Sequence, residues 1–363
     1  MSACENCLRR SALLGLLAPW IARALDQHRK LPALLSLPSE ELIEAVCGAN
    51  RGRLDAALGS FDLRRTRAQT AAAGLATVCR HDETFPARLL AASDAPHALH
   101  FLGDAAGLDT LAETLPVAIV GARRASPYGL EAARALGREL AACGVPVVSG
   151  MALGVDSAAH EGALEGGGLT VAVLAGAADY PYPRSKRSLH GAIAAHGLVL
   201  SEMPAGFRPF KWCFPARNRI MAGLAAMTVI VEGRTGSGSL ITARFAADLG
   251  REVGAVPGQV TSALAAGPND LLADGACVVR TAGDVLDALY GAGAGSRMRA
   301  EQPLPQLEPR LARTLEAVEQ GLGTADAIAR DPDEAGDVLA ALTELELIGL
   351  VRRAGAGRYV RRV

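Results

Sequence analysis

Residues 117–129 read Val-Ala-Ile-Val-Gly-Ala-Arg-Arg-Ala-Ser-Pro-Tyr-Gly. Four apolar residues in a row, three of them β-branched, are typical of a strand that is buried on both faces. Gly121 follows this run, Ser126 is a favoured helix N-cap, and Pro127 suits the first position of a helix. The stretch therefore predicts a strand, a tight turn and a helix, which is the repeating unit of an α/β fold.

The same pattern returns along the chain as far as residue 290. Short apolar runs alternate with Ala-rich helical segments, several of which end at a glycine, as at Gly144, Gly197 and Gly250. We therefore predict a doubly wound α/β domain, with an extended Rossmann-like parallel sheet covered by helices on both faces. The predicted strands are Val117–Val120, Val145–Ser149, Thr170–Leu174, Leu198–Ser201, Met227–Val231, Glu252–Val256 and Cys277–Val279.

Changes in composition divide the chain into four segments. Residues 1–78 show helical periodicity only and predict a small helical N-terminal module, while residues 79–290 hold the Rossmann-like domain. Residues 291–309 are rich in Gly, Ala and Pro and predict a linker. Residues 310–363 show three helical patterns followed by a short hairpin pattern, which predicts a winged-helix domain.

Charge and hydropathy exclude several classes of protein. The 363 residues carry 37 Lys and Arg against 38 Asp and Glu, a formal net charge of -1, which excludes a largely disordered chain. Any binding of a polyanion must therefore come from a local cluster of cations. No stretch approaches the roughly 20 apolar residues of a membrane helix, so we expect no membrane association.

The seven cysteines are odd in number and scattered, which favours a reducing compartment and therefore a cytoplasmic protein. Cys4 and Cys7 form a Cys-x-x-Cys pair, but no second pair or histidine follows at the spacing of a zinc finger. We interpret both residues as structural thiols, and we expect no metal site and no cofactor.

Ligands of open α/β sheets bind beyond the carboxyl ends of the strands, close to helix N-termini. A single glycine-rich loop at that edge would indicate only a tight turn, but several such loops favour phosphate binding through backbone amides. A Walker A sequence and a Gly-x-Gly-x-x-Gly after the first strand are both missing from the sequence. The loops expected at this edge contain Gly121–Arg124, Ser149–Met151, Gly176–Tyr180, Ser201–Glu202, Glu232–Ser239 and Pro257–Gly258.

The segment 207–219 interleaves aromatic rings with cations. Two Phe, one Trp and a further Phe lie within residues 207–214, four Lys or Arg side chains accompany them, and no acidic residue occurs between Glu202 and Glu232. Cations for phosphates and flat rings for stacking form the composition of a platform for single-stranded nucleic acid. In the alternative interpretation, Phe207 or Phe210 pins the loop to the core. For a second aromatic and basic cluster, residues 180–187, a solvated loop and a ligand contact both stay open.

Groups that could carry catalysis are few. Asp156 and His160 stand four residues apart on an expected helix, and we favour a capping or packing role for them. Glu202 and Glu232 each follow a predicted strand and could bind a ribose or order a turn. The sequence shows no nucleophile–base pair.

Five ordered motifs resemble the bacterial DNA processing protein A family, also called Smf. The similarity covers roughly residues 80–290, and one departure is Gly267-Pro268-Asn269, where the family usually has Gly-Thr-Asn. The motifs are residues 117–129, 149–160, 214–224, 237–243 and 250–258.

The resemblance implies a homodimeric Rossmann-like protein without enzymatic activity that binds single-stranded DNA. It further implies a recombination mediator that protects incoming DNA and helps to load the RecA recombinase in natural transformation. Arg123, Lys211, Phe214 and the pair Arg217 and Asn218 match the DNA-contacting positions of the family. With the glycine and hydroxyl loops added, the predicted DNA-binding set is Gly121, Arg123, Ser149, Gly150, Lys211, Phe214, Arg217, Asn218, Arg219, Ser237 and Ser239.

Two other functions compete with this one. The first is a nucleotide-processing enzyme of the related Rossmann-like group, which cleaves nucleoside monophosphates at the glycosidic bond. That group resembles this chain less, because its Pro-Gly-Gly-x-Gly-Thr turn is missing from residues 232–239. The second is a transcription regulator that uses the winged helix, which would leave the central motifs without a role.

Overall fold

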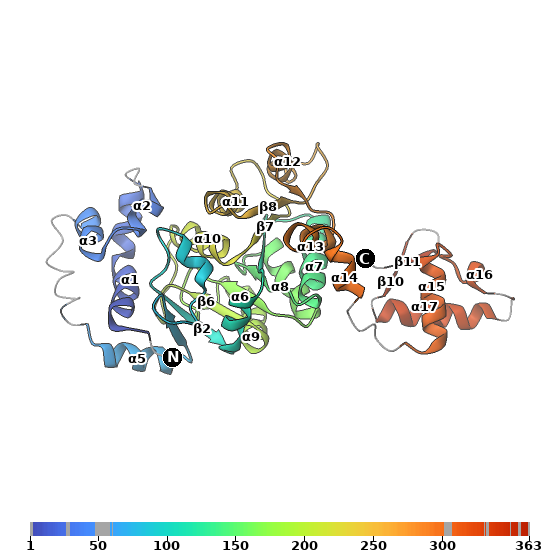
Figure 1. Cartoon of the computed structure of the whole chain (residues 1–363), viewed down its shortest axis with the longest axis horizontal. Helices are drawn as coiled ribbons and strands as arrows, with labels where there is room; N and C mark the ends of the chain where they lie inside the picture. Colours follow the sequence, from blue (N-terminus) through green and yellow to red (C-terminus); the bar gives the residue numbers. More distant parts are fainter. Residues whose placement is uncertain are drawn as a thin grey trace. The chain divides into compact units, whose positions relative to one another are not determined.

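The computed structural model describes residues 3–26, 30–47, 59, 61–300, 307–329, 331, 334–348, 350–354 and 357–361. The chain forms two compact units, Met1–Arg299 and Ala300–Val363. In the first unit, helices cover both faces of a central sheet (Figure 1). None of the described helices is both long enough and apolar enough to cross a membrane.

Among the described residues, nine strands form the central sheet in the order β1-β2-β6-β5-β4-β3-β7-β8-β9. The strands from β3 to β9 pair in parallel, whereas β1 with β2 and β2 with β6 pair antiparallel. The α/β Rossmann-like fold is confirmed, with the difference that the sheet is mixed and not wholly parallel. The seven predicted strands are β3 (Val117–Val120), β4 (Val147–Ser149), β5 (Thr170–Val173), β6 (Leu198–Ser201), β7 (Met227–Ile230), β8 (Glu252–Ala255) and β9 (Cys277–Val278).

The sequence patterns missed the two antiparallel strands, β1 (Ala76–Cys79) and β2 (Ala98–Gly103). His100 interrupts the apolar run of β2, yet its side chain is only 1% exposed. Its ring nitrogens each lie 2.9 Å from a hydroxyl, Nδ1 from Thr77 Oγ1 and Nε2 from Ser11 Oγ. Because both polar atoms have partners, the histidine can occupy a core position that sequence patterns reserve for apolar residues.

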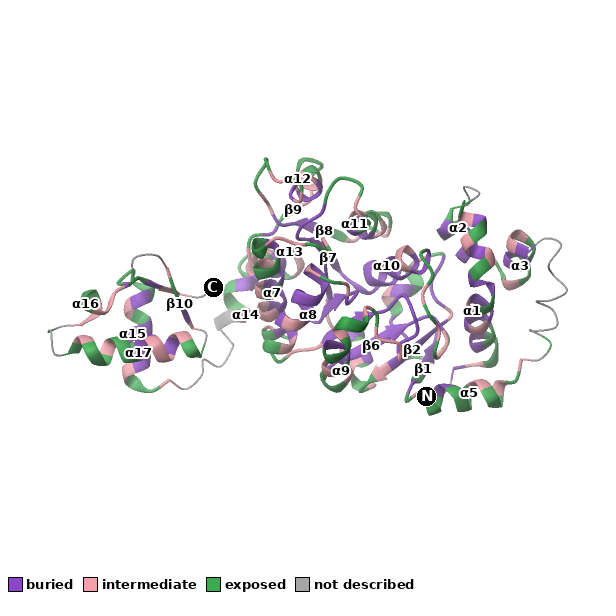
Figure 2. Cartoon of the chain, turned by 180° about the vertical axis from the view of Figure 1, so that it is seen from behind, coloured by how far each residue is buried: buried purple, intermediate pink, exposed green. Residues whose placement is uncertain are grey.

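Alternate residues of β3 face opposite sides of the sheet, so each side has its own core (Figure 2). Val117 and Ile119 contribute to one core, and Ala118 and Val120 contribute to the other. The first core includes α7 (Pro127–Ala142), α8 (Val155–Glu165) and α13 (Ala282–Tyr290); the second includes η2 (Ala87–Ala91), α6 (Ala106–Glu113), α10 (Cys213–Leu224) and α11 (Gly238–Asp248). The remaining helices on this sheet are η3 (Arg184–Lys186), α9 (Arg187–His196) and α12 (Ala266–Ala273).

The N-terminal segment is helical in its described part, as predicted. Its helices are α1 (Glu5–Asp26), α2 (Leu31–Leu35), α3 (Ser39–Cys47) and α5 (Leu63–Ala72), while residues 48–58 and 60 lie outside the described part. Leu17 and Ile21 of α1 share a core with Trp212, whose indole Nε1 donates a hydrogen bond to Ala18 O at 3.0 Å. These helices therefore pack onto the α/β domain, and residue 78 falls inside β1. The domain limits 1–78 and 79–290 stay a prediction.

The second unit contains α15 (Pro309–Glu319), α16 (Ala325–Ile328), α17 (Ala335–Leu347) and the antiparallel pair β10 (Val351–Arg353) and β11 (Tyr359–Arg361). These are the expected three helices and hairpin around a small apolar core, and the assignment as a winged helix stays a prediction. Part of the predicted linker is helical instead, as α14 (Ala294–Ala300). A Cβ on Gly295 would lie 2.7 Å from Gly283 Cα, so the glycines that suggested a linker allow α14 to approach α13 closely. Residues 301–306 lie outside the described part.

Candidate nucleic-acid interface

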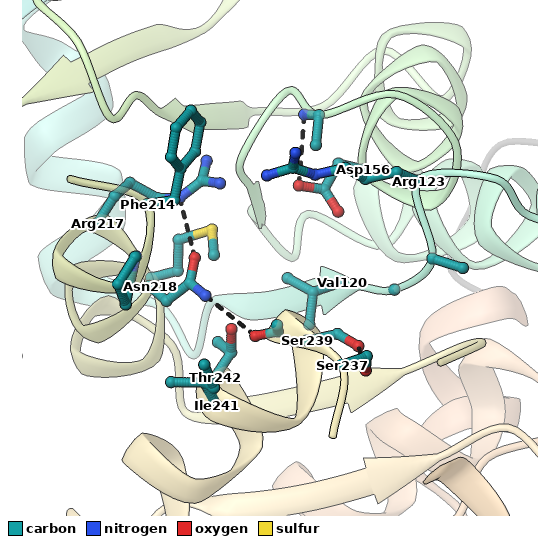
Figure 3. A pocket seen from close by; sticks show the side chains of 16 residues that line it. Val120, Arg123, Asp156, Phe214, Arg217, Asn218, Ser237, Ser239, Ile241 and Thr242 are labelled. Carbon is teal, nitrogen blue, oxygen red and sulfur yellow. Dashed lines mark hydrogen bonds between the residues drawn. The ribbon is translucent and has the colours of Figure 1, made fainter. Parts of the chain in front are cut away.

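A pocket of about 250 Å³ lies where the strand order reverses, beside the carboxyl ends of β3 and β7 (Figure 3). The chain builds β3 to β6 in one direction across the sheet and then places β7 on the other side of β3. Open α/β sheets bind their ligands at this position. The turn after β3 and the first turns of α8, α10 and α11 line the pocket, so three helix N-termini meet there.

Arg217 is buried beside the pocket and holds the turn after β4. Its guanidinium Nη1 donates hydrogen bonds to Gly150 O and Val173 O, both at 2.6 Å, and its Nε donates to Asn218 Oδ1 at 3.1 Å. Burial lowers the pKa of Arg217 to about 10, an effect that the nearby Asp156 carboxylate opposes. A Cβ on Gly150 would collide with this guanidinium, which explains the glycine. Arg217 therefore has a structural role in addition to its position in the pocket wall.

Phe214, which lines the pocket, is close to a cation and to a second ring. The guanidinium carbon of the exposed Arg123 lies 5.2 Å from the centroid of the Phe214 ring. The ring of the exposed Tyr182 is also close to Phe214, with ring centroids 5.6 Å apart and planes at 53°. The same three residues line an adjoining cavity of about 100 Å³. Tyr182 of the second aromatic cluster therefore lies beside the site, and a ligand contact by this residue stays a prediction.

The first turn of α11 supplies the polar wall of the pocket. Ser237 is the N-cap residue, and its Oγ lies 2.8 Å from Ser239 Oγ. Asn218 Nδ2 donates a hydrogen bond to Gly238 O at 3.1 Å and so joins this turn to α10. Thr242 also lines the pocket. Its buried Oγ1 has no hydrogen-bond partner among the described residues. A helix N-terminus with hydroxyl groups beside it is suited to an anionic ligand.

A sequence model of the family "DNA recombination-mediator protein A" matches residues 76–290, more than half of the chain. The chain belongs to this family. It is 41% identical over 254 residues to the putative DNA processing protein DprA of Mycobacterium tuberculosis, covering 66% of this chain and 65% of that relative, so it spans just under two thirds of the relative's length. It is 33% identical over 313 residues to the protein Smf of Synechocystis, covering 77% and 79% of the two chains.

Two solved structures of DprA proteins share the fold. DNA processing protein A from Streptococcus pneumoniae matches with a TM-score of 0.63 and 31% identity, covering 79% of this chain and 98% of that one. DNA processing protein A from Helicobacter pylori matches with a TM-score of 0.53 and 33% identity, covering 60% and 95%. The second structure is described as showing a unique single-stranded DNA binding mode for that protein.

Seven of the predicted residues of this DprA-family chain line the pocket, and Gly150 lines the adjoining cavity with Arg123, Phe214 and Arg217. Gly121 is required in the turn after β3, because a Cβ there would lie 2.7 Å from Val155 Cγ2. Lys211 is exposed on the loop before α10 but does not line the pocket. The seven residues are Gly121, Arg123, Phe214, Arg217, Asn218, Ser237 and Ser239.

The structure argues against direct DNA contact by two predicted residues. Ser149 is fully buried, and its Oγ donates a hydrogen bond to Ile119 O at 2.6 Å. Arg219 is 5% exposed and forms buried ion pairs with Glu202 at 2.5 Å and Asp94 at 3.4 Å. Arg219 stands two residues after Arg217, which places its side chain on a different side of α10.

The start of α10 also differs from the expectation. The sequence places Phe214 in extended conformation with the helix beginning at Ala216, but α10 begins at Cys213. Pro215 fits there because the N–H groups of the first helical turn have no partner within the helix. The loop is pinned to the core by Trp212, which is 4% exposed, and by the half-buried Phe207, as the alternative interpretation allowed, whereas Phe210 is 37% exposed. Sequence reasoning missed this role because the partner of Trp212 is the distant helix α1.

The carboxylates near the site accept hydrogen bonds from other groups of the protein. Glu232 accepts hydrogen bonds from Ser126 N at 2.9 Å and Ser126 Oγ at 2.5 Å, so it orders the start of α7. Asp156 accepts from Gly150 N at 3.2 Å and Ala152 N at 3.4 Å, and burial raises its pKa. His160 Nδ1 lies 2.7 Å from Thr170 Oγ1. Both side chains are buried and bound to groups of the protein, as a packing role predicts.

Proposed function

We propose that this chain is a recombination mediator that binds single-stranded DNA at the pocket between β3 and β7. The observation that carries the proposal is the cluster of Arg123, Phe214 and Tyr182, of which Arg123 and Phe214 line the same pocket as the N-terminus of α11. Rings that stack on bases and cations that neutralise phosphates are the two components of single-strand recognition. The family assignment and the DNA-binding mode described for the Helicobacter pylori relative support it.

Each part of the site has its own task in this proposal. A phosphate accepts hydrogen bonds from the first turn of α11, with Ser237, Ser239 and Thr242 providing hydroxyl groups. A base stacks on Phe214 or Tyr182, and Arg123 neutralises the adjacent phosphate. Lys211 contacts the DNA strand outside the pocket. The pocket volume of about 250 Å³ suits one phosphate or one base of a continuous strand better than a free dinucleotide cofactor.

The chain acts without catalysis in this proposal, in the cytoplasm and as a homodimer that protects incoming DNA and helps to load RecA during natural transformation. The location, the homodimer and the loading of RecA rest on the family alone. The engagement of Glu232 by Ser126 supports the absence of glycosidic cleavage, because that carboxylate is bound to the start of α7. Incubation with nucleoside monophosphates is expected to release no free base.

The binding proposal is tested by fluorescence anisotropy with a labelled oligonucleotide, single-stranded or duplex, over a series of salt concentrations. The unchanged protein is expected to prefer the single strand. Arg123→Ala is expected to weaken binding and to reduce the slope of log K against log salt by about 0.7, the value for one phosphate contact. Arg244→Ala, an exposed residue of α11 that does not line the pocket, is the matched control. Equal affinity and slope for Arg123→Ala and the control would remove the pocket from the site.

A further inference from the structure

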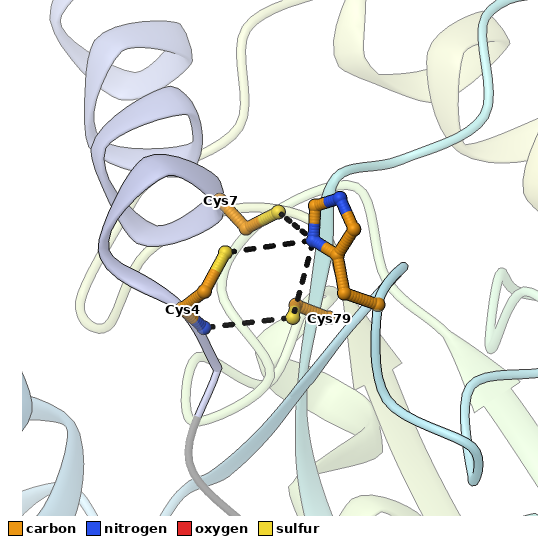
Figure 4. Close-up of side chains that lie close together, drawn as sticks. Cys4, Cys7 and Cys79 are labelled. Carbon is orange, nitrogen blue, oxygen red and sulfur yellow. Dashed lines mark hydrogen bonds between the residues drawn. The ribbon is translucent and has the colours of Figure 1, made fainter.

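Three cysteines and a histidine from distant parts of the chain meet at the base of α1 (Figure 4). Cys4 directly precedes α1, Cys7 lies in its first turn, and Cys79 is the last residue of β1. His81 follows in the next turn of the chain. One sulfur or nitrogen atom from each of the four residues lies within 4.8 Å of all the others. Cys79 and His81 do not stand at zinc-finger spacing in the sequence, but the fold brings them to Cys4 and Cys7.

The distances fit tetrahedral coordination of one ion. His81 Nδ1 lies 3.5 Å from Cys4 Sγ, 3.5 Å from Cys7 Sγ and 3.9 Å from Cys79 Sγ. A tetrahedral zinc ion with Zn–S of about 2.3 Å and Zn–N of about 2.05 Å requires a sulfur–nitrogen separation of about 3.6 Å. Cys4 N also lies 3.5 Å from Cys79 Sγ and donates a hydrogen bond to it, as backbone amides do towards metal-bound sulfur.

We propose that Cys4, Cys7, Cys79 and His81 bind one zinc ion. Three sulfur ligands and one imidazole match the borderline-soft donor set of structural zinc sites. Four protein ligands complete a tetrahedron and leave no position for water or substrate, so the ion has a structural and not a catalytic role. A disulfide explains the arrangement less well, because it would use two of the three sulfurs and give no role to the third or to His81.

The zinc ion joins two segments that are far apart in the sequence, since Cys4 and Cys79 are 75 positions apart. The surrounding cluster is small, with Ala3, Leu8 and Ala98 as its other buried members, so the ion supplies a link that apolar packing alone provides only weakly. It fixes the start of α1 to the edge strand of the sheet. The spacing explains why the sequence did not indicate the site, since the second pair is a Cys-x-His at the end of β1, a strand that the sequence patterns missed.

The test is metal analysis of the full chain, purified without a histidine tag and dialysed under reducing conditions. We expect inductively coupled plasma mass spectrometry to find one zinc ion per chain. Cys4→Ser combined with Cys7→Ser is expected to lower the zinc content to about a tenth or less. Cys277→Ser, a cysteine outside the cluster, is the matched control and should keep its zinc. Zinc absent from the unchanged chain, or retained by the double variant, overturns the proposal.

A second measurement covers the case in which the double variant does not fold. Zinc is removed from the unchanged chain with a chelator, and Co²⁺ is added in its place. We expect a thiolate charge-transfer band and the intense visible absorption of tetrahedral cobalt, at one equivalent per chain. His81→Cys should keep both the metal and this absorption, whereas His81→Ala should bind the metal more weakly. A weak spectrum of octahedral cobalt in the unchanged chain overturns the proposal.

Discussion

At the scale of single residues, the site depends on one half-buried ring. Phe214 lies in the first turn of α10, in contact with the Arg123 guanidinium and close to Tyr182, and it packs on the core that includes α1. The Arg123 cation is held over the ring by a cation–π contact, and it has no acidic partner among the described residues. Arg123 therefore keeps its charge available for a phosphate. The neighbouring Arg217 and Arg219 differ from it, because both are buried and bound to protein groups.

We predict that Phe214→Ala weakens single-strand binding by about 1–3 kcal/mol, the contribution of one stacked base. Phe214→Trp should retain binding, since the indole offers at least as large a face. The loss of folding stability should stay below the roughly 3–5 kcal/mol of a fully buried Phe, because the ring is partly exposed. Anisotropy and thermal melting on the same samples separate the two effects.

Phe210→Ala is the matched control for this prediction. Phe210 belongs to the same loop and is exposed, but it stacks near Phe207 with centroids 6.1 Å apart and does not line the pocket. Its removal should leave the affinity unchanged. If Phe214→Ala lowers the melting temperature strongly while the folded protein binds normally, the ring serves packing and not stacking.

At the scale of elements, the positions of helices relative to strands depend on buried polar pairs. His160 of α8 contacts Thr170 of β5, and Arg217 of α10 contacts the ends of β4 and β5 through Gly150 O and Val173 O. Sequence patterns could predict the apolar β-branched strands and the order of the helices, because these follow from local periodicity. They could not predict which of Arg217 and Arg219 faces the pocket, or that Trp212 packs beneath α1, because those contacts join distant segments.

His160 should make stability depend on pH. Burial, with a further contribution from the Arg217 charge, lowers the pKa of His160 from 6.5 to about 3. Between these two pH values the unfolded chain binds a proton at His160 that the folded chain does not bind. The contribution of His160 to the free energy of unfolding is therefore complete above about pH 6.5 and is lost as the pH falls. The loss from this group is up to about 1.4 kcal/mol per pH unit.

Urea unfolding at several pH values checks this prediction by comparing the unchanged chain with His160→Gln. The variant should be less sensitive to acid over this range, although less stable at neutral pH. His196→Gln, which alters an exposed histidine, is the control and should behave like the unchanged chain. Equal slopes for the unchanged chain and His160→Gln would contradict the assignment.

At the scale of the whole molecule, the chain consists of two units with separate cores. The complete pocket, the aromatic loop and the cysteine cluster all belong to the first unit. The first unit also includes α14, which packs on α13 through Gly295 and Gly283. A chain cut near residue 291, where the sequence predicts the end of the domain, would therefore lose the packed helix α14. Composition alone could not reveal that these residues form a packed helix.

We predict that a chain ending at residue 299 folds and binds single-stranded oligonucleotides with nearly unchanged affinity. The reason is that every group proposed to contact DNA lies before this point. Circular dichroism and anisotropy measure the two properties on the same protein. Loss of binding by the folded, shortened chain would move the principal DNA contact to the C-terminal unit and its arginines.

The most direct test of the DNA-binding pocket is photo-crosslinking of the full chain to a single-stranded oligonucleotide that carries 5-iodouracil. Mass spectrometry of the digested product identifies the residue that stacks on the modified base. The account predicts crosslinks at Phe214 or Tyr182, lost when the chain also carries Arg123→Glu. Crosslinks confined to other parts of the chain, such as the segment around Tyr359, would contradict it.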